Sequence, residues 1–342
     1  MRWTIWVTAF CLVAAGCSRP NRVTIYCALD REFSERLLER FARETGLTVA
    51  PRFDTEANKS VAIVEDLKRE KDRPRCDVHW NNEIIGTIRL QRAGVLEPYD
   101  SPSAAGYPGW SRAKDRTWQA FAARARVLIV NTKLLRPEDY PKSILDLAKP
   151  PLRGRVAMAK PIFGTTATHA ACLFEVLGPA RAEQFFRDLK ANAVQIVPGN
   201  KQSAERVGRG EYPCGLTDTD DAMAEIKAGR PVEVVYLDTE AHPEFPRLGT
   251  LYIPNTLALI RGAPNPDGGR KLIDYLLTPE LEQALAESAS AQIPLNPQVQ
   301  AKLPEAIRRP SQVRAMEVDF ERATDYWEQS QKLMRELFTD TP

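Results

Sequence analysis

The stretch "VTIYCALDREFSERLLERFARETGLTVAPRF", from Val23 to Phe53, decides the fold class. It begins with an apolar run that is typical of a buried strand. Apolar residues then recur on one helical face between Phe33 and Phe41, and Gly46 is suited to end that helix. "LTVAPRF" has the pattern of a second strand. Because short links join these elements, the stretch predicts a strand–helix–strand unit in a parallel sheet.

The same alternation continues along the chain. A helix from about residue 59 to 69 leads to the strand "CDVHW", and a second series of strands and helices covers about residues 129–254. The strand "LYIPNTLALI" is placed to carry the chain back. We therefore expect an α/β protein with two lobes, each a doubly wound sheet, and a cleft between them. The predicted lobes are residues 22–128 plus about 255–342, and about 129–254.

Composition and the absence of known motifs argue against several classes of function. The 342 residues are 43% hydrophobic and 27% charged with a net charge of +2, and no Lys/Arg run with interleaved aromatics argues for nucleic acid. The sequence has no G-x-S-x-G, H-E-x-x-H or P-loop motif, so catalysis has little support and we expect no catalytic cofactor. We also expect the protein to be a monomer. An exported hydrolase is the distant alternative.

The first seventeen residues predict export. Arg2 precedes the apolar run "WTIWVTAFCLVAA", which has the length of a signal peptide. The run ends in "AAGC", Ala14 to Cys17, which resembles the lipobox of bacterial lipoproteins. That resemblance implies acylation of Cys17 and a lipid anchor in the periplasm or cell envelope, and simple cleavage and release is the alternative.

Export also allows disulfides. Four cysteines remain in the mature chain, and their spacing shows no metal-type pattern. Either disulfides or buried free thiols are compatible with the sequence, which leaves the pairing open for Cys27, Cys76, Cys172 and Cys214.

The segment "GLTDTDDAMAEIKAG", Gly215 to Gly229, concentrates acids at a helix start. Thr219 can cap the helix, and Asp220 and Asp221 complement the helix dipole. Asp218 is left over by that structural account. Three like charges oppose one another unless something positive neutralises them, so we expect the cluster to face a bound cation.

Further candidates lie where strands end or helices begin. Several can equally be explained by capping, turn chemistry or core packing. Trp80 can stack on an organic cation. Threonines and an asparagine at two helix starts predict an anion subsite. The predicted ligand-binding residues outside the acid cluster are Glu56, Trp80, Asn82, Glu83, Thr165, Thr166, Asn200 and Asn255.

The opening stretch together with "DVHWNNEI", "FGTTATHAA", "IPNTLALIRGAPNPDGGRKLIDYLL" and "SAQIPL" resembles the ferric-iron-type extracellular solute-binding proteins of ABC importers. The resemblance covers nearly all of the mature chain in order. It implies the type II periplasmic-binding-protein fold, a permease and an ATPase as partners, and iron(III) with a synergistic anion as the ligand. The metal ligands would be Asp218, Asp220, Glu83 and Glu56.

One departure from that family keeps other ligands open. Ferric members usually carry adjacent tyrosines after the strand of the second lobe, where this chain has Thr217 to Asp221. Carboxylates still suit hard metal ions, and they also suit an ammonium group. An organic cation such as a polyamine and a phosphorylated organic solute are therefore the alternatives to iron.

Overall fold

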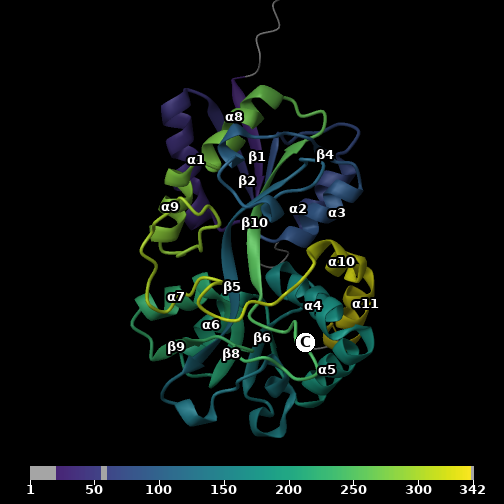
Figure 1. The fold of residues 1–342 in the computed structure, drawn as a ribbon, viewed down its shortest axis with the longest axis vertical. Helices are drawn as coiled ribbons and strands as arrows, with labels where there is room; N and C mark the ends of the chain where they lie inside the picture. Colours follow the sequence, from purple (N-terminus) through teal and green to yellow (C-terminus); the bar gives the residue numbers. More distant parts are fainter. Residues whose placement is uncertain (1–20, 55–59, 340–342) are drawn as a thin grey trace, which may run out of the picture.

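The computed structural model describes residues 21–54 and 60–339, which form two lobes, one above the other in Figure 1. One ten-stranded sheet runs through both lobes in the order β2-β1-β3-β10-β5-β8-β6-β7, with β4 paired to β10 and β9 to β5. The strands are β1 (Arg22–Cys27), β2 (Thr48–Phe53), β3 (Val78–Asn81), β4 (Leu96–Glu97), β5 (Gln119–Asn131), β6 (Val156–Ala159), β7 (Gln195–Val197), β8 (Cys214–Asp218), β9 (Val232–Val235) and β10 (Tyr252–Ile260).

The pairing confirms the predicted parallel units. β1 pairs in parallel with β2 and β3, and β6 pairs in parallel with β7 and β8. The long strands β5 and β10 are antiparallel to each other and pass from one lobe to the other in Figure 1. Each lobe therefore has its own parallel strands, and β5 and β10 connect them.

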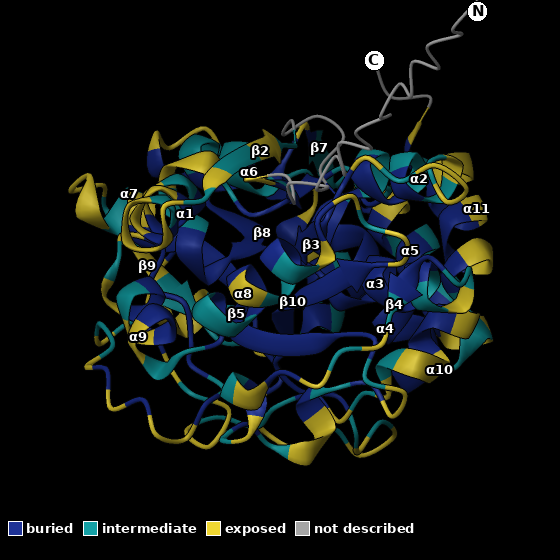
Figure 2. Ribbon diagram, turned by 90° about the horizontal axis from the view of Figure 1, so that it is seen from above, coloured by how far each residue is buried: buried dark blue, intermediate teal, exposed yellow. Residues whose placement is uncertain are grey.

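Helices cover both faces of the sheet, which is why the dark blue strands lie inside a shell of partly exposed helices in Figure 2. α1 shows the local logic: Leu37, Leu38 and Phe41 are buried on one face, and Gly46 ends the helix with a φ of 71°. The helices are α1 (Arg31–Thr45), α2 (Val61–Arg69), α3 (Ile84–Arg92), α4 (Gly164–Leu177), α5 (Pro179–Ala191), α6 (Asn200–Gly208), α7 (Thr219–Lys227), α8 (Pro266–Leu276), α9 (Pro279–Glu287), α10 (Phe320–Asp325) and α11 (Trp327–Phe338).

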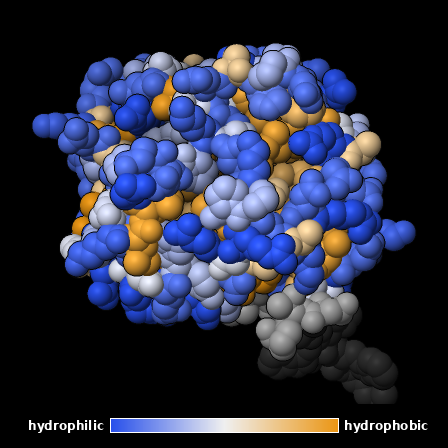
Figure 3. All heavy atoms as spheres, turned by 90° about the horizontal axis from the view of Figure 1, so that it is seen from below, coloured by the Kyte–Doolittle hydropathy of each residue, from blue (hydrophilic) through white to orange (hydrophobic). Residues whose placement is uncertain are grey.

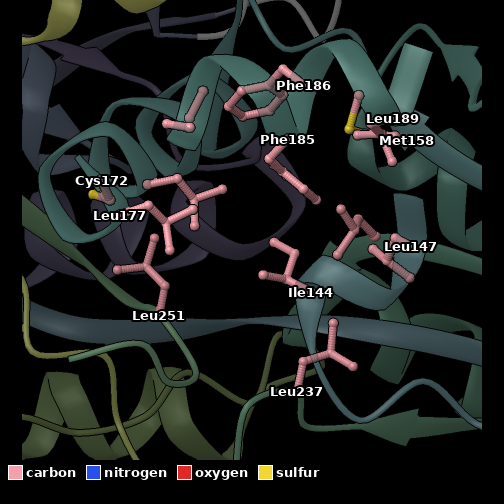
Figure 4. Packing of buried hydrophobic residues seen from close by; sticks show 14 of the residues in the cluster. Ile144, Leu147, Met158, Cys172, Leu177, Phe185, Phe186, Leu189, Leu237 and Leu251 are labelled. Atoms are coloured by element: carbon pink, nitrogen blue, oxygen red, sulfur yellow. The ribbon is translucent and has the colours of Figure 1, made fainter. Parts of the chain in front are cut away.

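The largest apolar cluster lies in the lower lobe. Figure 4 shows Phe185 and Phe186 of α5 beside Met158 of β6, with Ile144 and Leu147 across the gap. Burial of such side chains contributes roughly 1.5–3 kcal/mol each. Seen from below, the surface of this lobe is mostly hydrophilic with scattered apolar patches (Figure 3).

The C-terminal helices pack on the lower lobe. Trp327, Met334 and Phe338 of α11 join the cluster that contains α4 and α5. The ring centre of Tyr326, at the break between α10 and α11, lies 6.4 Å from that of Phe174. The lobe ranges predicted from the sequence stay a prediction. The packing of α10 and α11 bears on whether the last residues belong to the first predicted lobe.

Cys27, Cys76, Cys172 and Cys214 are buried free thiols in the described structure. Burial raises the pKa of Cys27 and of Cys214 to about 12. The question of pairing that the sequence left open is thus answered by four unpaired thiols. In the part of the chain that the structure describes, no helix is both long and apolar enough to cross a membrane.

Candidate functional site

The predicted acid cluster lies where β8 passes into α7. Asp218 is the N-cap residue of α7, and Asp220 and Asp221 occupy its first turn. Carboxylate oxygens of the three residues lie within 4.8 Å of one another. The predicted cap was wrong: Thr219 is the first helical residue, and its hydroxyl accepts a hydrogen bond from the backbone N–H of Ala125 instead.

Two arginines that the sequence analysis did not select neutralise much of this charge. Arg126 Nη1 donates to Asp218 Oδ1 at 2.8 Å, and Arg124 Nη1 donates to Asp220 Oδ2 at 3.2 Å. All four side chains are buried. Both arginines come from β5, two residues apart, so their side chains leave the strand on the same face. The acids therefore face protein cations.

The ionisation of the site follows from this pairing. Burial alone raises the pKa of Asp218, but the nearby Arg126 and Arg124 and the hydrogen bond from Thr165 outweigh burial and hold it below its usual value. For Arg124, burial is outweighed by Asp220 and Asp218, and its pKa is raised. Asp218 is thus a carboxylate and Arg124 a guanidinium cation at neutral pH.

The residues predicted to form an anion subsite lie beside the acids. Thr165 Oγ1 donates to Asp218 Oδ2 at 2.6 Å, and Thr166 Oγ1 donates to Asn200 Oδ1 at 2.9 Å. Asn200 Nδ2 donates to Thr165 Oγ1 at 2.7 Å, and Arg126 Nη1 donates to Asn200 Oδ1 at 3.0 Å. Residues from the starts of α4 and α6 are therefore in one hydrogen-bonded network with Asp218.

A small cavity of about 20 Å³ opens against this network. It has room for about one water-sized group in this conformation. Gly164, at a φ of 54°, starts α4 there and presents no side chain. The lining residues include Asn82, Arg124, Lys160, Gly164, Thr165, Gly199, Asn200, Asp218 and Asp221.

Two residues that line this cavity have a buried polar atom that lacks a partner in the described structure. These atoms are Asn82 Oδ1, which accepts hydrogen bonds, and Arg124 Nε, which donates one. Lys160 lines the cavity and makes no ion pair with the described residues. Because buried polar groups usually find partners, these atoms indicate a site that receives both an acceptor and a donor.

Glu83, a predicted ligand, has structural partners. It is the N-cap of α3, and both of its carboxylate oxygens accept from the N–H of Gly86 at 3.0 Å. Thr168 Oγ1, on α4 of the lower lobe, donates to Glu83 Oε2 at 2.7 Å. Its neighbour Asn82 uses its backbone oxygen to accept from Arg124 Nη2 at 2.6 Å. Glu83 and Asn82 therefore join α3 to the lower lobe and to β5.

Trp80 and Asn255 are buried and do not line the cavity. The interpretation of Trp80 as a wall for a cation is corrected by its full burial: its ring centre is 5.4 Å from that of Phe121, and its Nε1 donates to Asn255 Oδ1 at 3.4 Å. β3 is buried on both faces, so strand alternation does not bring either face to a ligand. Asn255 also donates to Gln292 Oε1 at 3.0 Å, and Gln292 Nε2 donates to Asp220 Oδ2 at 3.3 Å.

Two predicted residues cannot be placed. Glu56 lies outside the described residues, and so do Cys17 and the rest of the predicted signal peptide. Of the predicted metal ligands, Asp218 and Asp220 are brought together, and Glu83 is held in the capping arrangement described above.

The arginines had a signal in the sequence. In "AFAARARVLIV" two arginines alternate with apolar residues inside a strand that is otherwise apolar. A charge inside such a strand is buried at high cost unless it is paired. The pattern therefore predicts two acidic partners near the arginines. In the structure these partners are Asp218 and Asp220.

Comparisons with known proteins agree with this architecture. A family model described as bacterial extracellular solute-binding protein matches residues 23–288. The major ferric iron-binding protein of Neisseria meningitidis serogroup A is 26% identical over 281 residues, which cover 81% of this chain and 82% of that protein.

Solved structures share the fold. Iron-bound HitA from Pseudomonas aeruginosa matches with a TM-score of 0.82 at 21% identity, over 93% of this chain and 99% of that one. AfuA from Actinobacillus pleuropneumoniae, with fructose-6-phosphate bound, matches with a TM-score of 0.80 at 22% identity, over 94% and 99%. The predicted two-lobe α/β fold is confirmed by these likenesses.

Proposed function

The chain belongs to the bacterial extracellular solute-binding proteins, and we propose that it captures a small solute with a phosphate or phosphonate group between its lobes and delivers it to an ABC importer. As a member of that family it is a binding protein and not an enzyme. The observation that carries the ligand class is Lys160, which pairs with no acid among the described residues and lies beside the starts of α4 and α6, at one cavity.

The anionic group of the solute fits this end of the cavity. α4 and α6 both begin there, and backbone N–H groups at helix starts together with the helix dipole favour an anion. The Lys160 ammonium and the buried Arg124 Nε–H supply further donors. A tetrahedral oxyanion, which has several acceptor oxygens, uses such donors well.

The rest of the solute lies against hydrogen-bond acceptors of the same cavity. Asn82 Oδ1 has no donor among the described residues, and Asp218 and Asp221 line the same cavity. A hydroxyl or amino group on the solute satisfies Asn82 Oδ1. Since the cavity of about 20 Å³ holds only one water-sized group, the solute enters with the lobes further apart than in this structure.

Iron(III) with a synergistic anion is the second candidate. Three carboxylates within 4.8 Å of one another favour it, and so do the names of the relatives from Neisseria and Pseudomonas. Against it, guanidinium groups already pair with Asp218 and Asp220, and a metal ion at those oxygens would be repelled by two buried positive charges. An organic cation is less favoured as the ligand, because Trp80, the side chain expected to stack on it, is buried in the core.

Melting temperatures of the chain from Ser18 onward test the ligand class. A true ligand at 100 times its Kd stabilises the folded state by about 2.7 kcal/mol. We expect fructose 6-phosphate or 2-aminoethylphosphonate to raise the melting temperature, and Lys160→Glu to remove the rise. Lys149→Glu, at an exposed lysine elsewhere on the lower lobe, is the matched control. A rise with ferric citrate and none with the phosphorylated solutes would instead support iron.

The setting of the function follows from the family and from the first residues. We infer a monomer in the periplasm, held to a membrane by lipid on Cys17, with a permease and an ATPase as partners. Cys17→Ser should move the protein from the membrane fraction to the soluble fraction. Retention of the variant in the membrane fraction after a salt wash would contradict the lipid anchor.

A further inference from the structure

A second, larger cavity lies on another side of the molecule, between α3 and α10. These two helices face each other on the right of Figure 1. The cavity has a volume of about 850 Å³ and shares no lining residue with the cavity at Asp218. That volume is in the range of pockets that hold small organic ligands, roughly 300–1,000 Å³. Nothing in the proposed solute capture uses it.

Its walls are apolar and come from distant parts of the chain. α3, the segment 109–118, the start of β10 and the segment 310–321 all contribute. The last segment is held in place, because Met316 N donates to Thr250 O at 2.8 Å and Thr250 N donates to Arg314 O at 2.9 Å. The apolar and aromatic lining residues are Ile84, Ile88, Trp110, Trp118, Tyr252, Met316, Val318 and Phe320.

The Trp110 side chain, which lines this cavity, is exposed to solvent. It is 65% exposed, more than Leu134, the other large hydrophobic residue that is exposed in the described structure. By contrast, Trp118 on the same cavity is buried, and its Nε1 donates to Gln91 Oε1 at 2.9 Å. An exposed indole at the mouth of an apolar cavity is typical of a binding surface.

The acids at the rim are already engaged. Asp115 Oδ1 accepts from Gln91 Nε2 at 2.9 Å, Asp319 caps α10, and Glu321 lies 3.4 Å from Arg92. Lys114 is exposed at the same rim and makes no ion pair with the described residues. Among the charged side chains that line this cavity, Lys114 is therefore the one with neither an ion pair nor a hydrogen bond to the described residues.

We propose that this cavity is a second binding site, and that its ligand is a small amphipathic anion with a compact apolar body and one acidic group. The body lies against Trp110, Met316 and Phe320, and the acidic group lies at Lys114. Apolar burial supplies most of the affinity. The ion pair with an exposed lysine orients the ligand and adds a smaller contribution.

Two fluorescent probes with the same body test the proposal. 1-Anilinonaphthalene-8-sulfonate carries one acidic group, and N-phenyl-1-naphthylamine carries none. We expect both to bind the folded chain from Ser18 onward at one saturable site, and the sulfonate to bind more tightly. Lys114→Glu should weaken the sulfonate roughly tenfold, since it replaces attraction by repulsion. The same substitution should change the affinity of the uncharged probe by less than about twofold.

Two further variants examine the apolar wall. Val318→Trp fills the cavity from a half-buried position, and Trp110→Ala removes an exposed wall without touching the core. Both should weaken both probes, the first at least about tenfold. Lys133→Glu, at an exposed lysine on a different cavity, should change neither probe. Binding that does not saturate, an equal effect of Lys114→Glu on both probes, or unchanged binding in both wall variants would overturn the proposal.

Discussion

Arg126 and Asp218 stand directly opposite each other on the paired strands β5 and β8, and their side chains meet at 2.8 Å with 1% and 4% exposure. Such a pair is held by strand register as well as by charge. Asp218 is at the same time the residue that starts α7. The pair therefore fixes the candidate site to the strand that connects the two lobes.

Breaking this pair should be costly. Removal of one member leaves a buried charge without compensation, so we expect Arg126→Met to lower the free energy of unfolding by about 3–5 kcal/mol. Urea denaturation followed by circular dichroism measures the change. The double variant Arg126→Met with Asp218→Asn should recover a large part of the loss, because neither charge is then left alone.

A matched exposed pair supplies the control for that experiment. Arg136 lies 3.3 Å from Glu138, with its side chain 74% exposed. Arg136→Met should change the free energy of unfolding by no more than about 0.5 kcal/mol. Equal effects of the two arginine substitutions would contradict the account of the Arg126 pair.

Two buried histidines predict how stability depends on pH. Burial lowers the pKa of His79 to about 4, and burial together with Arg126 lowers the pKa of His169 to about 3, while Asp218 acts in the opposite direction. In the unfolded chain both take up a proton near pH 6.5. The folded state thus binds fewer protons than the unfolded state below that pH, and stability is lost as pH falls from about 6.5 towards 4.

The size of this effect is set by linkage. Each histidine should contribute a slope of about 1.4 kcal/mol per pH unit between pH 6 and 5. Denaturation at several pH values measures the slope, and His169→Gln should reduce it by about that amount. A wild-type curve that is flat between pH 6.5 and 5 would be incompatible with neutral buried histidines.

The fold could be predicted because its signal is local. The alternation of apolar strands with helices such as α1, whose buried face and terminal Gly46 are both visible in the sequence, determines the parallel units. The start of α7 at the acid cluster was also visible. The break at Tyr326 between α10 and α11 has no such local signal, because the amphipathic pattern continues across it.

The site was only partly predictable, because its partners meet through the fold. Asp218, Thr165, Thr166 and Asn200 were selected from strand ends and helix starts, and the structure brings them together. Arg126 is on a strand that runs past all of them, and only the pairing of β5 with β8 places it opposite Asp218. Local pattern gives the position of a residue within its element, whereas partners depend on sheet order.

The four buried thiols give a third prediction. Thiolate is the reactive form, and burial raises the pKa of Cys27, Cys76, Cys172 and Cys214. The native chain from Ser18 onward should therefore not be alkylated by iodoacetamide at pH 8, as judged by intact mass. After unfolding in urea without a reductant, all four should be modified. Fewer than four modifications would mean that a disulfide is present.

The contact between Thr168 and Glu83 gives the last prediction. Thr168, on α4 of the lower lobe, donates to the carboxylate of Glu83, which caps α3 of the upper lobe, and both side chains are buried. Thr168→Val keeps the shape and removes the hydroxyl, so a buried carboxylate loses one donor. We expect a loss of about 1–3 kcal/mol in the free energy of unfolding.

The same variant also tests whether this contact holds the lobes together. Small-angle X-ray scattering of Thr168→Val should show a larger radius of gyration than the wild type, because the hydrogen bond that joins α4 to α3 is absent. Thr168→Ser keeps the hydroxyl and should restore both the stability and the radius. If the valine and serine variants scatter alike while both remain folded, the hydrogen bond does not control the separation of the lobes.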